Sequence, residues 1–316
     1  MTFDLSTIGE GQIRLTVNQG ERLSQARTLR MTAACSEANV SGLLAQLGRH
    51  TSWASIMPKG DLAKRVLDEF RSVNVDLSNM VLRDEGRVAL YFMEPGEFPM
   101  PGKVTYDRLH TPFREASIDD FNWDSMLDTK LVFVTGITAA LTENTAKVVQ
   151  YFVDQAAERG IDIALDVNYR SMLWDGDRAR EVLTPIAEKA KLLFCSKRDG
   201  QTVFGMDGSG PEICANLRER FGNTHVVSTD QVDGIYVSSA EAGEHVFEVK
   251  RVPVIDRPGA GDSFVAGTMH GYLQGDILQG VIYGRRTAVY ALTHHGDLTH
   301  ISPAELDIPE TSDIVR

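Results

Sequence analysis

The chain has 316 residues, 42% of them hydrophobic, a formal net charge of −12 and a pI near 5.1. This length and apolar content can bury the core of one large α/β domain or of two ordinary domains. The acidic balance provides no long-range basic field, which argues against nucleic acid or an anionic membrane as a partner.

The cysteines Cys35, Cys195 and Cys214 are odd in number and widely spaced, which favours a reducing compartment over a zinc site or a disulfide framework. The first residues contain no basic segment followed by an apolar stretch, and no apolar run approaches the length of a membrane span. We therefore expect a cytoplasmic protein.

The first third of the chain contains segments that alternate between apolar and polar residues, at 13–17, 87–93 and 103–106. This period of two predicts half-buried antiparallel strands. Helices are expected over 37–47 and from about residue 61. Residues 12–35 and 88–115 together predict a small discontinuous β-sheet, which we interpret as a lid.

From residue 131 onward, short apolar runs alternate with amphipathic segments. Strands are expected at 131–136, 161–168, 191–195 and 224–229, and a helix that Thr142 caps is expected to run to Gly160. Such alternation is typical of a parallel sheet covered by helices. We assign residues 1–11, 36–87 and 116–316 to this main α/β domain.

The most informative segment is 252–273, which we predict to be a strand followed by a helix from about Gly261. The small residues Gly259, Ala260 and Gly261 let backbone N–H groups at a helix N-terminus face an anion such as a phosphoryl group. Asp262 follows in the first turn. A lone aspartate there often only caps the helix, but after Gly-Ala-Gly we interpret it as a base that accepts a hydroxyl proton.

The segment from Asp256 to Gly267 resembles the DTxGAGDxFxxG signature of the ribokinase-like carbohydrate kinases, with Asp262 in the position of the catalytic base. The resemblance implies a doubly wound, mostly parallel sheet flanked by helices, with a small β-sheet lid. It also implies ATP as phosphoryl donor and Mg²⁺ as cofactor.

Arg257 and Pro258 depart from this signature, in a neighbourhood that helps several members of the family to hold a monovalent cation. Such a cation is therefore doubtful here. We hypothesise that the charge of Arg257 substitutes for it, in which case activity should not depend on potassium.

Four segments resemble the 2-keto-3-deoxygluconate kinase branch, namely 35–39, LYFMEPG, KVTYDR and DVNYRSMLW. This implies phosphorylation of that sugar acid to its 6-phosphate. An arginine should meet the acid's carboxylate, and Arg108 and Arg170 are the candidates. The substrate-binding residues that the resemblance implies are Cys35, Asn39, Tyr91, Tyr106, Arg108, Arg170, Asp262 and Asp297.

The nucleotide side is mapped from weaker matches, because Ser196 and Asp230 depart from the usual residues of the family. Arg170 could face ATP instead of the sugar acid, and Asp199 could orient Mg²⁺ through water. The nucleotide-binding residues that the resemblance implies are Asn168, Arg170, Ser196, Ser228, Asp230, Gly234, Gly259, Gly261 and Ala291. His294, His295 and His300 lack the spacing of a metal site and are interpreted as surface or capping residues.

Two alternatives stay open: a kinase for a neutral sugar such as a ketohexose or a nucleoside, and a catalytically silent sugar-binding regulator. The altered positions 257, 258, 196 and 230 favour the regulator, and the retained Asp262 argues against it.

A homodimer through the lid is also expected, since a sheet with one exposed apolar face can pair with a second copy.

Overall fold

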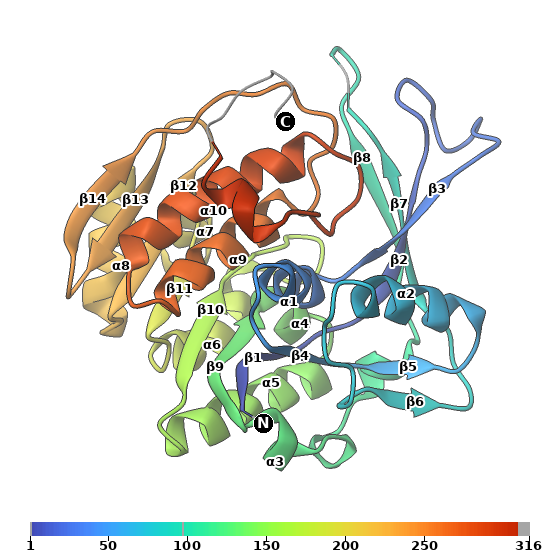
Figure 1. Cartoon of the computed structure of the whole chain (residues 1–316), viewed down its shortest axis with the longest axis horizontal. Helices are drawn as coiled ribbons and strands as arrows, with labels where there is room; N and C mark the ends of the chain where they lie inside the picture. The colour runs from blue at the N-terminus through green and yellow to red at the C-terminus, as the bar shows by residue number, and fades with distance from the viewer. Residues whose placement is uncertain (1, 97, 309–316) are drawn as a thin grey trace.

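A computed structural model describes residues 2–96 and 98–308. Its main sheet has eight strands in the order β14-β13-β12-β11-β10-β9-β1-β4, and all neighbours from β12 to β4 run parallel. Figure 1 shows this sheet in the body of the molecule. The strands are β1 (Phe3–Ile8), β4 (Thr51–Ala54), β9 (Thr129–Thr135), β10 (Asp162–Asp166), β11 (Leu192–Phe194), β12 (His225–Asp230), β13 (Gly234–Ser239) and β14 (Gly243–Phe247).

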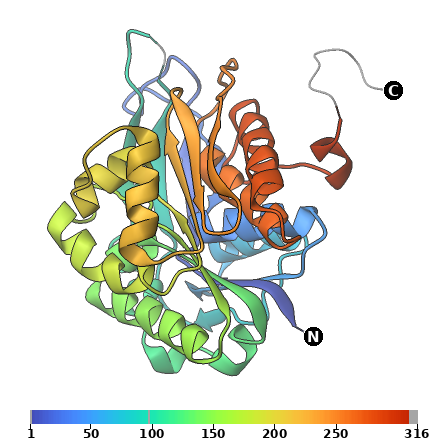
Figure 2. The same cartoon turned by 90° about the vertical axis from the view of Figure 1, so that its left-hand side faces the viewer.

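Helices cover both faces of the main sheet (Figure 2). On one face pack α4 (Gly136–Ala140), α5 (Glu143–Glu158), α6 (Gly176–Ala187), α7 (Lys197–Phe204) and α8 (Gly210–Phe221). On the other face pack α1 (Ser36–Gln46), α9 (Ala260–Tyr272) and α10 (Ile277–Leu292). Strand β9 is buried at all but one position because helices lie against both of its faces. The predicted doubly wound α/β class is confirmed.

Several predicted elements are confirmed with small changes at their ends. Thr142 caps α5 by accepting a hydrogen bond from the backbone N–H of Thr145. The helices expected over 37–47 and from residue 61 are α1 and α2 (Asp61–Arg71). The remaining elements are α3 (Trp123–Met126), the two-stranded parallel pair β5 (Ile56–Pro58) and β6 (Val81–Arg83), and the 3-10 turns η1 (Pro112–Glu115), η2 (Ile118–Asp120) and η3 (Pro303–Leu306).

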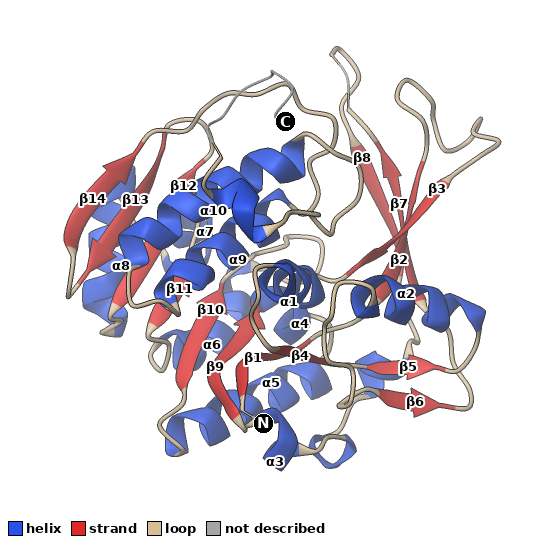
Figure 3. Ribbon diagram, in the orientation of Figure 1, coloured by secondary structure: helices blue, strands red, loops and turns tan. Residues whose placement is uncertain are grey.

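A second sheet of four strands projects from the body as the predicted lid (Figure 3). Its order is β3-β2-β7-β8, with β2 (Gln12–Thr16), β3 (Arg30–Ala34), β7 (Ala89–Glu94) and β8 (Lys103–Asp107). The prediction of antiparallel strands was wrong for one pair, because β2 and β7 are parallel. Strand β2 continues from core strand β1, and β7 enters the lid after α2 and β6, so both run away from the body in the same direction.

The strand predicted at the start of segment 252–273 is absent: residues 250–259 form no strand. Strands β13 and β14 already extend the sheet as antiparallel neighbours, and Pro253 and Pro258 remove two backbone donors. The segment instead contacts the end of α10, where the Ile255 N–H donates to the Leu292 carbonyl oxygen. Strands β1, β4, β13 and β14 were not predicted.

No helix within the described residues is both long and apolar enough to cross a bilayer.

Candidate active site

A cleft of about 1380 Å³ lies between the lid and the carboxyl ends of the parallel strands. Its walls include lid residues, the ends of β10, β11 and β12, and the start of α9. Loops at the carboxyl ends of parallel strands are where α/β folds bind their ligands. The cleft is therefore the candidate active site.

The start of α9 provides a backbone surface without obstructing side chains. Gly259 adopts a left-handed φ of 85°, and a Cβ atom there would lie 2.0 Å from the carbonyl oxygen of Asp297. A Cβ atom on Gly261 would meet no protein atom within 4 Å. Among the described residues no side chain caps α9. The Ala260 N–H donates to the Arg257 carbonyl oxygen at 3.3 Å, so the N–H groups of Gly261 and Asp262 are the ones that can face an anion in the cleft.

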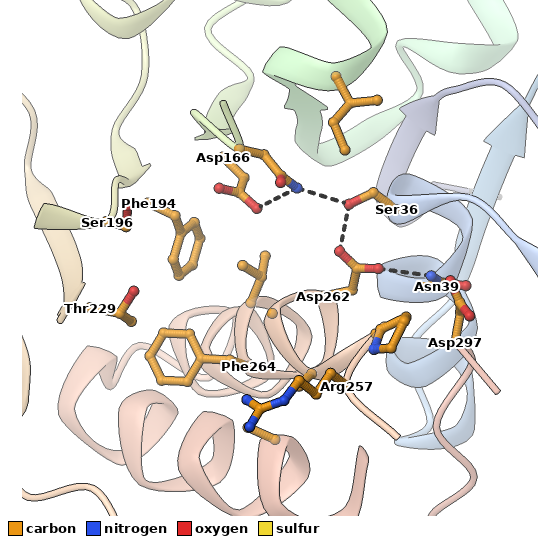
Figure 4. A pocket seen from close by; sticks show the side chains of 18 of the residues that line it. Ser36, Asn39, Asp166, Phe194, Ser196, Thr229, Arg257, Asp262, Phe264 and Asp297 are labelled. Carbon is orange, nitrogen blue, oxygen red and sulfur yellow. Dashed lines mark hydrogen bonds between the residues drawn. The ribbon is translucent and has the colours of Figure 1, made fainter. Parts of the chain in front are cut away.

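Asp262 follows in the first turn of α9, and two side chains of α1 hold its carboxylate (Figure 4). The Ser36 hydroxyl donates to one oxygen at 2.5 Å, and the Asn39 amide donates to the other at 2.7 Å. Burial raises the pKa of Asp262 to about 6, although both hydrogen bonds favour the charged form. The carboxylate is thus fixed in place and largely ionised at neutral pH.

Two further carboxylates, Asp166 and Asp199, line the same part of the cleft. Burial and the charges of Asp262 and Asp199 raise the pKa of Asp166 to about 8. Burial also raises the pKa of Asp199, whose backbone N–H donates to Ser196 at the start of α7. Asn168 donates from its amide to both Ser36 and Asp166, at 3.2 Å each. The uncompensated negative charge favours a cation or a positively charged side chain here.

The lid side of the cleft is polar. Tyr91 donates from its hydroxyl to a carboxylate oxygen of Asp297 at 2.6 Å, and its ring centroid lies 5.9 Å from that of Tyr106. The side-chain oxygens of Gln12 and Asn39 are buried without a hydrogen-bond partner among the described residues, and both residues line the cleft. Buried acceptors without a partner favour a ligand that donates hydrogen bonds.

The two arginines proposed for a substrate carboxylate differ in their surroundings. Arg108 is buried and donates through Nε and Nη2 to one oxygen of Glu10, at 2.9 and 2.6 Å, so its charge is already matched. Arg170 is exposed at the cleft, where its charge offsets part of the rise that burial causes in the pKa values of Asp166, Asp199 and Asp262. Arg170 is the better placed of the two to meet an anionic ligand.

Most of the residues proposed from the sequence line this one cleft, and three do not. Those that line it are Cys35, Asn39, Tyr91, Tyr106, Arg108, Asn168, Arg170, Ser196, Asp199, Asp230, Gly259, Ala260, Gly261, Asp262 and Asp297. Ser228 faces away, because it alternates along β12 with the lining residues Val227 and Thr229. Gly234 lies under the Tyr236 ring, and Ala291 is fully buried behind Ala288 and Leu292, which line the cleft.

Sequence analysis did not propose several residues of the site and its surroundings, among them Gln12, Arg14, Ser36, Asp166, Phe194 and Phe264. Asp166 carried a usable signal, since a carboxylate at the carboxyl end of a predicted parallel strand is expected to face the ligand edge. Ser36 was within a quoted segment but its chemistry was not considered. Nothing local in the sequence distinguishes Gln12 and Arg14 from ordinary polar residues of a half-buried strand.

Arg257 lines the cleft with an exposed side chain (Figure 4). Its backbone N–H donates to the Asp256 carboxylate at 3.0 Å. The guanidinium that contacts the Asp256 carboxylate is that of Arg14, at 2.6 Å. The hypothesis that the charge of Arg257 substitutes for a monovalent cation stays a prediction. No group of three or more potential metal-ligating side chains occurs within 2–96 and 98–308.

Comparison with known proteins gives consistent matches over nearly the whole chain. The model of the pfkB family of carbohydrate kinases matches residues 3–304. A 2-dehydro-3-deoxygalactonokinase of Haloferax volcanii is 33% identical over 310 residues, which cover 97% of this chain and 96% of that protein. A 2-dehydro-3-deoxygluconokinase of Bacillus subtilis is 28% identical over 279 residues, covering 87% and 85%. The crystal structure of a 2-dehydro-3-deoxygluconokinase from Thermotoga maritima superposes with a TM-score of 0.90 at 26% identity, covering 97% of this chain and 98% of that one.

Proposed function

Because this chain belongs to the pfkB family of carbohydrate kinases, we propose that it phosphorylates a 2-keto-3-deoxy sugar acid with ATP. The acceptor is 2-keto-3-deoxygluconate or its galactonate counterpart, and the product is the 6-phosphate. The observation that carries the proposal is the position of Asp262, held by Ser36 and Asn39 beside the uncapped N-terminus of α9. The names of the relatives favour the sugar acid.

In this proposal Asp262 accepts the proton of the attacking hydroxyl. In-line phosphoryl transfer has a loose transition state, so a well-placed carboxylate is a sufficient base. The backbone N–H groups that follow Gly259 stabilise the charge on the transferring group, and they need no rearrangement because the helix already holds them. Gly261 leaves space for that group.

The carboxylates of the cleft fit a magnesium ion held mainly by ATP. Mg²⁺ is usually bound through one or two carboxylates together with phosphate oxygens and water, so no three-residue protein cage is needed. Asp199, through water, and Asp166 would hold it; burial raises the pKa of both carboxyl groups, and a bound cation would favour their charged forms. When bound, Mg²⁺ neutralises charge on the phosphates during transfer.

The two ends of the cleft suit the two substrates. The unpaired amide oxygens of Gln12 on lid strand β2 and of Asn39 on α1 suit sugar hydroxyls, and Arg170, which follows core strand β10, suits a carboxylate or a phosphate. At the other end, Phe194 and Phe264 meet edge to face with ring centroids 6.5 Å apart, and both line an apolar wall that suits adenine.

The test is an ADP-release assay with ATP, Mg²⁺ and a panel of acceptors. We expect turnover with 2-keto-3-deoxygluconate or 2-keto-3-deoxygalactonate and much less with fructose or a nucleoside. Faster turnover of fructose or a nucleoside would favour the neutral-sugar kinase. Binding of the panel without ADP release from any member would favour the silent regulator and contradict the proposal.

A cytoplasmic location and a homodimer through the lid are part of the proposal. Met31 of lid strand β3 is exposed and, in the strand register, lies on the opposite face of the lid sheet from Tyr91 and Tyr106, which is compatible with an interface between two copies. Analytical ultracentrifugation tests the dimer, and a single monomeric species at micromolar concentration would contradict it.

A further inference from the structure

Arg14 lies on lid strand β2 with its side chain completely buried. Its guanidinium bridges two carboxylates that are distant in sequence, donating to Asp256 at 2.6 Å and to Asp297 at 2.7 Å. Charge-assisted hydrogen bonds of this length are the strong ones, and a guanidinium offers two donors in fixed geometry. Arg14 is not among the residues that line the cleft, so any effect on chemistry must pass through its partners.

Both partners belong to the loops that flank the start of α9. Asp256 precedes the helix, and its carboxylate also accepts hydrogen bonds from the backbone N–H groups of Arg257 and Gly296, at 3.0 and 3.2 Å. The Asp297 backbone packs directly against Gly259, where no Cβ atom could fit. The two loops are thus joined to each other and to Arg14.

The lid makes a second contact with the same group. Tyr91, which pairs with Arg14 in the β2–β7 register, donates its hydroxyl to the second carboxylate oxygen of Asp297 at 2.6 Å. Both oxygens of Asp297 therefore bind lid residues. The lid and the start of α9 share one buried group of charges.

We propose that Arg14 is a positioning residue, which fixes the first turn of α9, and Asp262 with it, relative to the lid. Without the guanidinium, Asp256 and Asp297 would be two buried like charges without a cation, and the loops that carry them would separate. The lid side binds the acceptor and α9 carries the base, so this separation would misalign the two. The expected effect on turnover rests on the proposed phosphoryl transfer. The coupling of the lid to α9 does not depend on that function.

The test compares Arg14→Met and Arg14→Lys with a matched control, Arg87→Met. Arg87 forms an exposed ion pair with Asp107 of lid strand β8 and lies outside the cleft lining. We expect Arg14→Met to lower kcat by roughly tenfold to a hundredfold, because small misplacements of reacting groups have effects of that order. Arg14→Lys should retain intermediate activity, since one ammonium group cannot reproduce the two directed hydrogen bonds of the guanidinium. Arg87→Met should match the wild type.

Chemical rescue separates positioning from loss of fold. Guanidinium chloride, well below denaturing concentrations, should restore part of the kcat of Arg14→Met and should not activate the wild type. Wild-type kcat in a folded Arg14→Met variant would overturn the proposal. So would a loss of activity that guanidinium does not restore and that a lowered melting temperature explains.

Hydrogen–deuterium exchange tests the coupling without any substrate. In Arg14→Met the amides of residues 256–262 and of lid strands β2 and β7 should exchange faster together, while Arg87→Met should leave residues 256–262 unchanged. If the wild type phosphorylates no sugar acid, the proposed function fails and this measurement still decides the coupling. Unchanged exchange at 256–262 in Arg14→Met would overturn it.

Discussion

The Asn39 amide donates a 2.7 Å hydrogen bond to the carboxylate of Asp262, across 223 residues of sequence. The bond also orients the amide, since its nitrogen faces a carboxylate and its oxygen must therefore face elsewhere. That oxygen is buried and unpaired among the described residues, beside the candidate base. One side chain thus holds the base and leaves an acceptor for a substrate hydroxyl.

Replacing the base should abolish turnover and preserve binding. We expect Asp262→Asn to lower kcat by about 10²-fold or more, the upper part of the range for general-base catalysis, with the dissociation constant for the sugar acid changed little. The ADP-release assay and calorimetry measure the two quantities. Asp124→Asn, at an exposed aspartate that does not line the cleft, is the control. Turnover close to the wild-type value would place the base elsewhere.

The pH dependence should report the ionisation of Asp262. Burial raises its pKa to about 6, and only the charged form accepts a proton, so kcat/KM for the sugar acid should fall as pH drops through this value. Asn39→Leu removes a hydrogen bond that favours the charged form, so the pKa should rise and the fall should begin at higher pH. If the fall in kcat/KM moved to lower pH in Asn39→Leu, the assignment of this ionisation to Asp262 would be contradicted.

Gln12 should affect the acceptor and not the nucleotide. Gln12→Met keeps the length of the side chain and removes the unpaired amide oxygen, so we expect KM for the sugar acid to rise about 2- to 10-fold, the equivalent of one hydrogen bond. KM for ATP should stay the same. Thr32→Val is the control, since Thr32 has an unpaired hydroxyl in the same lid sheet but outside the main cleft. An equal rise in both KM values would contradict the assignment.

The two glycines at the start of α9 should respond differently to alanine. Gly261→Ala places a methyl group in open cleft space, so the melting temperature should hold while kcat falls, because the methyl occupies the position proposed for the phosphoryl group. Gly259→Ala requires a Cβ atom at a positive φ and 2.0 Å from the Asp297 carbonyl oxygen, so it should lower the melting temperature. Full activity of Gly261→Ala would show that the transferring phosphoryl group does not bind at this position.

The fold was predictable where the sequence pattern is periodic. The alternation from residue 131 onward predicted the parallel sheet, and Thr142 and Gly160 marked the ends of α5. The strand expected at the start of segment 252–273 was wrong because an apolar run shows burial but not which partner is available, and the sheet edge was already extended by β13 and β14. The orientation of β2 beside β7 depends on connections that no local pattern reveals.

The site was predictable where the local motif carries its own chemistry. Asp262 and its glycines could be identified from one segment, whereas Arg14 and Gln12 acquire their significance only from residues more than 70 positions away. The contact of Arg14 with Asp256 shows the same limit, because the two residues are 242 positions apart in the sequence.

The close packing of α9 on α10 determines which part of the molecule can move during a catalytic cycle. A Cβ atom on Gly267 would lie 2.7 Å from the Cα atom of Gly284, and one on Gly271 would lie 2.3 Å from that of Gly280. Backbones in such contact can neither slide nor rotate against each other without a clash. The two helices therefore form a stiff pair, and Asp262 in the first turn of α9 keeps its position relative to α10. We therefore expect closure over a substrate to move the lid relative to this helix pair, and the rate of opening to respond to changes in the lid rather than in α9 and α10.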